Sequence, residues 1–450
     1  MRTTLRTGRA AVAAAAVGAL ALAGCGGGDG GGPGDDAGGG AARTVELPRL
    51  DGESLQVAAV WSGPEQENFT RVLEEFERRT GAEVAFVPAQ DPIVTFLGTK
   101  IAGGSPPDVA MLPQVGAVEQ AVERGWAKPV GPEAAAQLEK NYSPGWRELG
   151  TVDGTAYAVY YKAANKSLVW YNSAVFENAG VDEPATWQEF LRTARTVSAS
   201  GVTPVSVAGS DGWTLTDWFE NVYLSQAGPE SYDRLGRHEI PWTDPSVARA
   251  LTTLAELFGD ESLIAGGADG ALQTEFPASV TQTFTGGEAP RAAMVFEGDF
   301  VAVNIAQTDA EIGTDARVFP FPAVGGKAPV VTGGDAAVAL RDGEGAQALL
   351  TFLASPDAAA ISAGAGGFLS PNRALDPGAY PNDVQRGIAE ALIAAGDDFR
   401  FDMSDRMPQS FGGTPGKGAW KALQDFLKNP RDVAGTQRRL EADAAAAYRD

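Results

Sequence analysis

The sequence predicts an α/β protein with two lobes, because short apolar strands and amphipathic helices alternate along a chain of 450 residues. At ~100–200 residues per domain, this length corresponds to about two to four domains. The hydrophobic fraction of 44% and the charged fraction of 21% are typical of a folded globular chain. A net charge of −23 argues against nucleic-acid binding, which needs basic groups to displace counterions from phosphates.

The chain has one histidine, His238, and one cysteine, Cys25. This excludes an internal disulfide framework, a Cys/His zinc site and a Cys-His dyad, and a Ser-His-Asp triad could use only His238. No P-loop and no calcium-loop spacing is present, and the glycine cluster Gly364, Gly366 and Gly367 does not complete the GxGxxG motif. The sequence therefore predicts no cofactor and no metal.

The amino-terminal residues have the pattern of a secretory signal. Residues 1–24 hold three arginines and no acidic residue, and an apolar run covers residues 10–23. The run ends Leu22-Ala23-Gly24-Cys25, which resembles the bacterial lipobox with Cys25 as the lipidated residue. The alternative is an ordinary cleaved signal with a chance cysteine. Ten of the fifteen residues 26–40 are glycine, which predicts a flexible tether.

The first part of the body alternates strands and helices. We expect strands at 55–61, 82–87 and 107–112, and helices at 64–79 and 91–102. This alternation predicts βαβ units and a parallel sheet with helices on both faces. Ligands of such sheets bind beyond the carboxyl ends of the strands, which points to Trp61–Glu65, Asp108 and Gln114.

The chain becomes more helical after Asn172. Periodicity predicts helices at 187–198, 218–227, 246–258, 345–354, 420–427 and 432–448. Strand-like pieces lie at 155–161, 203–207, 292–296, 317–321 and 335–340. No internal repeat is evident, so we expect two α/β lobes with a cleft between them.

Two tryptophans and an acid lie close together in Trp213-Thr-Leu-Thr-Asp217-Trp218, after a glycine-rich turn. Indole faces match the apolar faces of a pyranose ring, and neighbouring acids can bond its hydroxyl groups. A lone tryptophan more often belongs to the core, so Trp213 is open to both interpretations. Asp217, Glu297 and Asp299 are also candidates for the paired carboxylates of a glycoside hydrolase.

Several motifs resemble the family 1 extracellular solute-binding proteins of ATP-driven importers, relatives of the maltose-binding protein. The likeness covers about residues 54–448. It is most specific in YYKAANKSLVWYN (160–172), FENAG (176–180) and PATW (184–187). TDW (216–218), AGPE (227–230) and HEIPW (238–242) resemble the subgroup for α-glucosides and related oligosaccharides.

The resemblance implies a periplasmic-binding-protein-like fold of type II, whose lobes are built from discontinuous segments. We expect a signal at 1–24, an anchor and tether at 25–53, a first lobe from 54–163 plus 299–335, and a second lobe from 164–298 plus 336–450. The residues carried over as the ligand site are Trp61, Ser62, Glu65, Asp108, Gln114, Lys162, Asn165, Trp213, Asp217, Glu297, Asp299, Gly333, Gly334, Asp335 and Arg373. Relatives often have Lys-x-Asn after the tyrosine, whereas Ala163 and Ala164 separate Lys162 from Asn165 here.

The function implied is that of a monomeric, non-catalytic lipoprotein, anchored through Cys25 to the outer face of the cell membrane. It would capture a carbohydrate, by the narrower likeness an α-glucoside, and deliver it to the permease subunits of an ABC importer. Two alternatives remain at this point: an exported glycoside hydrolase, and a receptor of the same fold for a solute that is not a sugar.

Overall fold

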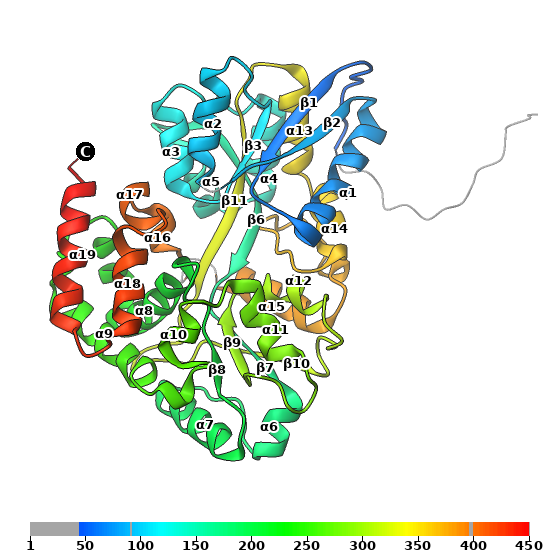
Figure 1. Ribbon diagram of the computed structural model, residues 1–450. Coiled ribbons are helices and arrows are strands. Elements are labelled where there is room, and N and C mark those ends of the chain that lie inside the picture. Colours follow the sequence, from blue (N-terminus) through cyan, green and yellow to red (C-terminus); the bar gives the residue numbers. More distant parts are fainter. Residues whose placement is uncertain (1–44, 91, 396–398, 450) are drawn as a thin grey trace, which may run out of the picture. The chain divides into compact units, whose positions relative to one another are not determined.

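The computed structural model describes residues 45–90, 92–395 and 399–449, which belong to one compact unit, 43–450. Two main sheets organise this unit (Figure 1). The first has the order β12-β11-β3-β1-β2, with β6 paired to β11, and the second has the order β10-β7-β9-β8. Their strands are β1 (Ser54–Ala59), β2 (Glu83–Pro88), β3 (Val109–Leu112), β6 (Ala158–Asn165), β11 (Val331–Ala339) and β12 (Arg400–Phe401) in the first sheet, and β7 (Leu168–Asn172), β8 (Val205–Ser206), β9 (Met294–Glu297) and β10 (Ala316–Pro320) in the second. A small hairpin joins β4 (Thr151–Val152) to β5 (Thr155–Ala156).

Helices cover both sheets. The first sheet is accompanied by α1 (Gly63–Thr80), α2 (Ile93–Ala102), α3 (Val115–Glu123), α4 (Pro132–Asn141), α5 (Pro144–Leu149), α13 (Glu344–Leu353), α14 (Pro356–Ala365) and α15 (Asp383–Ala394). The second is accompanied by α6 (Ser173–Ala179), α7 (Trp187–Ser200), α8 (Trp213–Gly236), α9 (Pro245–Phe258), α10 (Gly267–Ala271), α11 (Phe276–Phe284), α12 (Val301–Ile305), α17 (Gln409–Gly412), α18 (Gly418–Lys428) and α19 (Val433–Ala447). The helix α16 (Met403–Arg406) contacts both α3 and α8. Two short 3₁₀ turns lie at Glu261–Leu263 and Pro377–Ala379.

The expected α/β class and two-lobe build are confirmed. Buried apolar side chains form two clusters: one surrounds the first sheet and also includes Trp170, Val295 and Ala316 of the second sheet, and the other contains the remaining core of the second sheet. The helix α1 shows how the local sequence determines an element. Phe69, Val72 and Phe76 lie on one face and are buried, and Gly81 ends the helix with a φ of 82°. At α7, Thr186 and Glu189 form a reciprocal capping box. Most expected strands and helices are present within a few residues.

The helix α8 differs from its prediction, because it begins at Trp213 and not at Trp218. Gly212 precedes it with a φ of 79°, and a Cβ at Gly212 would lie 2.9 Å from the Cβ of Trp420. Both the backbone angle and the close approach require glycine there. Glycine at position 212 therefore lets the chain start α8 directly against Trp420, and Trp213 is the first residue of that helix.

The lobe assignment differs from the predicted boundaries. The strand β11 lies antiparallel between β3 and β6, and β12 pairs with β11, so the chain stays with the first sheet through Phe401. The sequence assigned 336–450 to the second lobe. Conversely, β10 pairs with β7 in the second sheet, although 299–335 was assigned to the first lobe. Sheet membership depends on distant pairing partners, which the local pattern does not encode.

Among the described residues, no single helix is long and apolar enough to cross a membrane. One pair, α13 with α14, passes that test only when the two are taken together, and the pair is bent by 61°.

Candidate functional site

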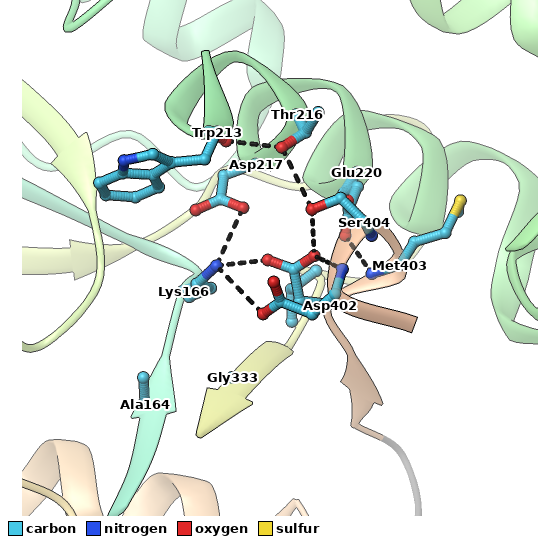
Figure 2. A network of polar contacts seen from close by, with 12 residues as sticks. Ala164, Lys166, Trp213, Thr216, Asp217, Glu220, Gly333, Asp402, Met403 and Ser404 are labelled. Atoms are coloured by element: carbon cyan, nitrogen blue, oxygen red, sulfur yellow. Dashed lines mark hydrogen bonds and ion pairs between the residues drawn. The ribbon is translucent and has the colours of Figure 1, made fainter. Parts of the chain in front are cut away.

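Lys166 lies in the link that carries the chain from β6 in the first sheet to β7 in the second. Figure 2 shows its ammonium between the carboxylates of Asp217 and Asp402. The Nζ atom is 3.3 Å from Asp217 Oδ1 and 3.9 Å from Asp405 Oδ2, and it also forms an ion pair with Asp402. Asp217 is on α8, and Asp402 precedes α16. One lysine therefore ties together three segments that are far apart in the sequence.

Neighbouring charges determine the protonation states of Lys166 and Asp402. Burial alone would lower the pKa of Lys166, but Asp217, Asp402 and Asp405 together raise it well above its usual value. Burial also opposes ionisation of Asp402, yet the Lys166 ammonium lowers the pKa of Asp402 to about 2. Asp402 Oδ1 accepts the Ser404 hydroxyl at 2.7 Å and the Asp405 N–H at 3.0 Å. Lys166 and Asp402 thus form an ion pair in which both carboxylate oxygens have donors.

Glu297, at the end of β9, differs from Asp402 because its oxygens are free. Its side chain is 1% exposed, and neither carboxyl oxygen accepts a hydrogen bond from an N–H or O–H donor. Asp217 is fully buried, and its Oδ2 also has no donor. The two carboxyls lie within hydrogen-bonding reach of each other, and burial raises the pKa of both well above the usual range. A proton shared between the Asp217 and Glu297 carboxyls would form a hydrogen bond between them and remove one of the two negative charges.

An aromatic surface adjoins these carboxyls. Trp213, Phe276 and Phe300 are each half-buried, and their ring centroids are 5.4 to 6.0 Å apart. The Lys166 Nζ lies 5.5 Å from the centre of the Trp213 ring. Half-exposed rings beside buried acceptors match the two needs of a sugar, an apolar face to stack on and groups to bond its hydroxyls.

A second polar group is centred on Lys162, four residues earlier on β6. Lys162 pairs with Glu65 at the start of α1, and its Nζ lies 3.9 Å from Asp335 Oδ2 on β11. The Trp61 ring centre is 5.7 Å from the same Nζ, and the Trp61 side chain also hydrogen-bonds Asp335. Burial raises the pKa of Asp335 to about 6. This group belongs to the first lobe.

The strands β6 and β11 bring the two lysine groups together. Asp335 is opposite Lys162 and Gly333 is opposite Ala164 in the antiparallel register. A Cβ at Gly334 would lie 2.6 Å from the Lys162 carbonyl oxygen, and one at Gly333 would lie 3.2 Å from Lys166 Cε. Both positions therefore need glycine, because a larger residue would collide with the Lys162 carbonyl group or crowd the Lys166 side chain.

Asp299 lies beside the crossing that starts at Asn165 and leads from β6 to β7. Asp299 Oδ1 accepts the Asn165 N–H at 2.7 Å, and the Asp299 N–H donates to the Asn165 carbonyl at 3.2 Å. Asp299 is 2% exposed, its Oδ2 has no donor, and burial raises its pKa to about 7. The Asn165 side chain accepts the Ser167 N–H at 3.1 Å, so it holds the link between β6 and β7.

The structure does not bring all predicted site residues together. Gln114, before α3, hydrogen-bonds Asp405 and so joins the Lys166 group. Asp108 lies at the other end of β3, where its Oδ2 accepts the Gln56 N–H at 2.8 Å and its Oδ1 lies 3.5 Å from Arg341. The rule about carboxyl ends fails for it because it precedes its strand. Ser62 is exposed and makes no side-chain cap.

Arg373 also lies apart from both lysine groups. It is exposed, its N–H donates to the Asn141 carbonyl at 2.9 Å, and its guanidinium donates to the Tyr142 carbonyl at 3.4 Å. These bonds tie it to the loop between α4 and α5 and not to the Trp213 surface.

Sequence reasoning missed Lys166, Asp402, Asp405 and Glu220. Lys166 was visible inside the NKSLVWYN run, but Lys162 was chosen in its place. Asp402 and Asp405 follow a two-residue strand and carried no signal of their own. Glu220 is about one turn after Asp217 on α8, and its carboxylate accepts the Met403 N–H at 2.6 Å and the Ser404 N–H at 2.9 Å.

Asp217, Glu220 and Asp402 have carboxylate oxygens within 4.8 Å of one another, which is the spacing of a metal site. The oxygens of Glu220 are already used by backbone donors, and Lys166 already supplies a cation to Asp217 and Asp402. Donors of the chain itself therefore already occupy the carboxylate oxygens that a metal ion would use.

Known proteins resemble this chain in sequence and in fold. Residues 62–360 match the model of the bacterial extracellular solute-binding protein family. An osmoprotective compounds-binding protein of Synechocystis sp. is 33% identical, over 84% of this chain and 89% of that protein. An alpha-glucosides-binding periplasmic protein of Rhizobium meliloti is 32% identical, over 86% of this chain and 87% of that protein.

Solved structures agree on the fold. The bacterial solute receptor AcbH superposes with a TM-score of 0.76 at 21% identity, over 88% of this chain and 99% of that one. A maltose-bound protein of T. maritima superposes with a TM-score of 0.71 at 18% identity, over 87% of this chain and 99% of that one.

Proposed function

Because the chain belongs to the bacterial extracellular solute-binding protein family, we propose that it captures a carbohydrate between its two lobes and delivers it to the permease of an ABC importer. The ligand proposed is an α-glucoside or a related oligosaccharide. The names of the relatives in Rhizobium meliloti and Synechocystis sp., which bind alpha-glucosides and osmoprotective compounds, support this class.

The observation that carries the proposal is the half-exposed aromatic surface of Trp213, Phe276 and Phe300 beside carboxyl oxygens that lack donors. A neutral sugar brings hydroxyl donors to such oxygens and an apolar ring face to the indole. Closure of the lobes around the ligand would remove both from water, and the ligand would shift the open–closed equilibrium by its contacts with the closed form.

The same geometry disfavours a glycoside hydrolase. The two acids of such enzymes stand about 5 Å apart in retaining enzymes and about 6.5–9.5 Å apart in inverting ones, with the glycosidic bond between them. Asp217 and Glu297 are within hydrogen-bonding reach of each other, which leaves no room for a bond to be cleaved. Receptor function without turnover fits this spacing better.

We also propose that the protein works outside the cytoplasm as a monomer, held at the membrane by a lipid on Cys25. Cys25 lies outside the described residues, so this part of the proposal depends on the lipobox-like sequence.

The experiment is a thermal-shift screen with maltose, trehalose and longer oligosaccharides, followed by titration calorimetry. Binding raises the melting temperature by an amount that grows with the ratio of ligand concentration to Kd.

Trp213→Ala is expected to weaken binding of the best sugar at least about tenfold, or about 1.4 kcal/mol. Trp126→Ala is the matched control, since Trp126 is also half-buried but packs against Arg124 after α3. Equal affinity of the Trp213 variant and the wild type would remove Trp213 from the site. Steady release of monosaccharide would favour the hydrolase.

A further inference from the structure

The buried charges around Lys166 are strongly unbalanced. Five buried or half-buried carboxyls surround this single ammonium: Asp217, Glu220, Glu297, Asp402 and Asp405. Donors already fill the oxygens of Glu220 and Asp402. Among the fully buried oxygens of these five carboxyls, three have no donor, two on Glu297 and one on Asp217. They lie together, because these two carboxyls are within hydrogen-bonding reach of each other.

An unfilled carboxylate is costly at this depth, since Glu297 is 1% exposed and Asp217 fully buried. A proton can neutralise the pair in the absence of a ligand. A hydroxyl group of a ligand supplies one donor and leaves the negative charge in place. A primary ammonium supplies three donors and a positive charge, and the number of donors equals the number of unfilled oxygens.

The chain itself shows that an ammonium fits these surroundings. Lys166 Nζ lies 3.3 Å from Asp217 Oδ1 and 5.5 Å from the centre of the Trp213 ring. An aromatic face attracts a cation through its quadrupole. Phe276 and Phe300 extend the same aromatic surface.

We propose that the site prefers a carbohydrate that carries a protonated amino group, and that Glu297 with Asp217 is the specificity-determining pair that binds this group. The inference rests on the proposed function, because the sugar ring is still held by the Trp213 surface. It adds a preference for a positive charge, so that an amino derivative of such a sugar binds more tightly than the neutral sugar.

Titration calorimetry on the full chain tests this with matched sugars. The probes are methyl α-glucoside and trehalose, their 2-, 3-, 4- and 6-amino-deoxy forms, and the N-acetyl derivatives of those amines. At pH 7, at least one amino form is expected to bind at least about tenfold tighter than its neutral parent. Its N-acetyl derivative, which has no charge and is larger by one acetyl group, is expected to lose that gain.

Glu297→Gln is expected to abolish the preference for the amine while keeping the size of the side chain. The control is Glu256→Gln on α9, which removes one charge from the same lobe at an exposed position, and it is expected to keep the preference. Parents that bind as tightly as every amino form would overturn the inference and leave the proposed function standing. The same conclusion follows if the N-acetyl forms bind like the amines. If no sugar of either series binds, both proposals fail. The N-acetyl comparison needs only the wild type, so the test survives a Glu297 variant that does not fold.

Discussion

Lys166 is a buried ammonium with three acidic neighbours, and its side chain is only 12% exposed. Exposed ion pairs contribute little to stability because water screens them and side-chain entropy opposes them. A buried pair differs: removing one partner leaves the other as an uncompensated charge in a poorly polarisable environment. Lys166 therefore stabilises the fold chiefly because, without it, the ionised Asp402 would remain buried with no positive charge beside it.

Lys166→Met is expected to lower the free energy of unfolding by about 3–5 kcal/mol at pH 7. The methionine keeps most of the side-chain volume, so the loss reports the charge. Urea unfolding followed by circular dichroism measures it.

The matched control is Lys421→Met on α18. Lys421 also forms an ion pair, with Asp425, but the two side chains are 51% and 40% exposed. Its loss is expected to stay below about 1 kcal/mol. Lys166→Met combined with Asp402→Asn should recover part of the lost stability, because the stranded charge is gone. A double variant no better than Lys166→Met would contradict the stranded-charge account.

At the scale of elements, the crossings between the sheets are tied by polar groups. Asn165 ends β6, where the chain crosses to the second sheet, and Asp299 follows β9. Two hydrogen bonds between these residues hold the end of β9 beside the crossing. The Asp299 carboxyl is buried, and burial raises its pKa to about 7. An unfolded aspartate has a pKa of about 4. The folded protein thus binds the Asp299 proton more tightly than the unfolded chain does.

The consequence is a stability that depends on pH. Between about pH 4 and pH 7 the unfolded chain releases this proton first, so the contribution of Asp299 to stability is present at the acid end and is lost as the pH rises. Asp299→Asn keeps the acceptor for the Asn165 N–H and removes the titration. From pH 5 to pH 8, the variant is expected to lose roughly 1–4 kcal/mol less stability than the wild type. Urea unfolding of the ligand-free proteins at both pH values measures this difference, and parallel pH dependences would refute it.

Local patterns predicted most elements because their causes are local. The face of α1 that carries Phe69 and Phe76 is visible as helical spacing, and Gly81 marks its end. The start of α8 was placed too late because the Gly212 turn depends on contact with Trp420, which is distant in the sequence. The candidate site shows the same division. Trp213 and Asp217 were found in one short run, whereas Asp402 is brought to Lys166 by the pairing of β12 with β11.

At the scale of the whole molecule, long-range pairing decides which residues share a lobe. The strand β11 enters the first sheet between β3 and β6, and α13 and α14 then pack against α4 and α1. The predicted boundary at residue 336 followed the chain order of the motifs, which holds no information on these pairings. The first core cluster includes residues of both sheets, so the packing of the two lobes is joined as well as their chain.

The proposed receptor has to stay near a permease, and Cys25 is the residue proposed to hold it there. It is the single cysteine of the 450-residue chain, so no other thiol can replace it. Two of its neighbours, Ala23 and Gly24, are small, as a lipobox requires. Cys25→Ser is expected to remove lipidation and to move the protein from the membrane fraction to the soluble fraction, because a polypeptide without an acyl chain has no apolar anchor there.

Expression of both forms in a bacterium that processes lipoproteins, with metabolic labelling by a fatty-acid analogue, measures the change. Sugar affinity in calorimetry serves as the control for folding and should be equal for the two forms, since the Lys166 and Lys162 groups lie in the body of the chain. If the serine variant still sediments with membranes, an interaction other than a lipid on Cys25 holds the protein there. Loss of the label together with release would place the receptor on a lipid tether, from which it can reach the permease without diffusing away.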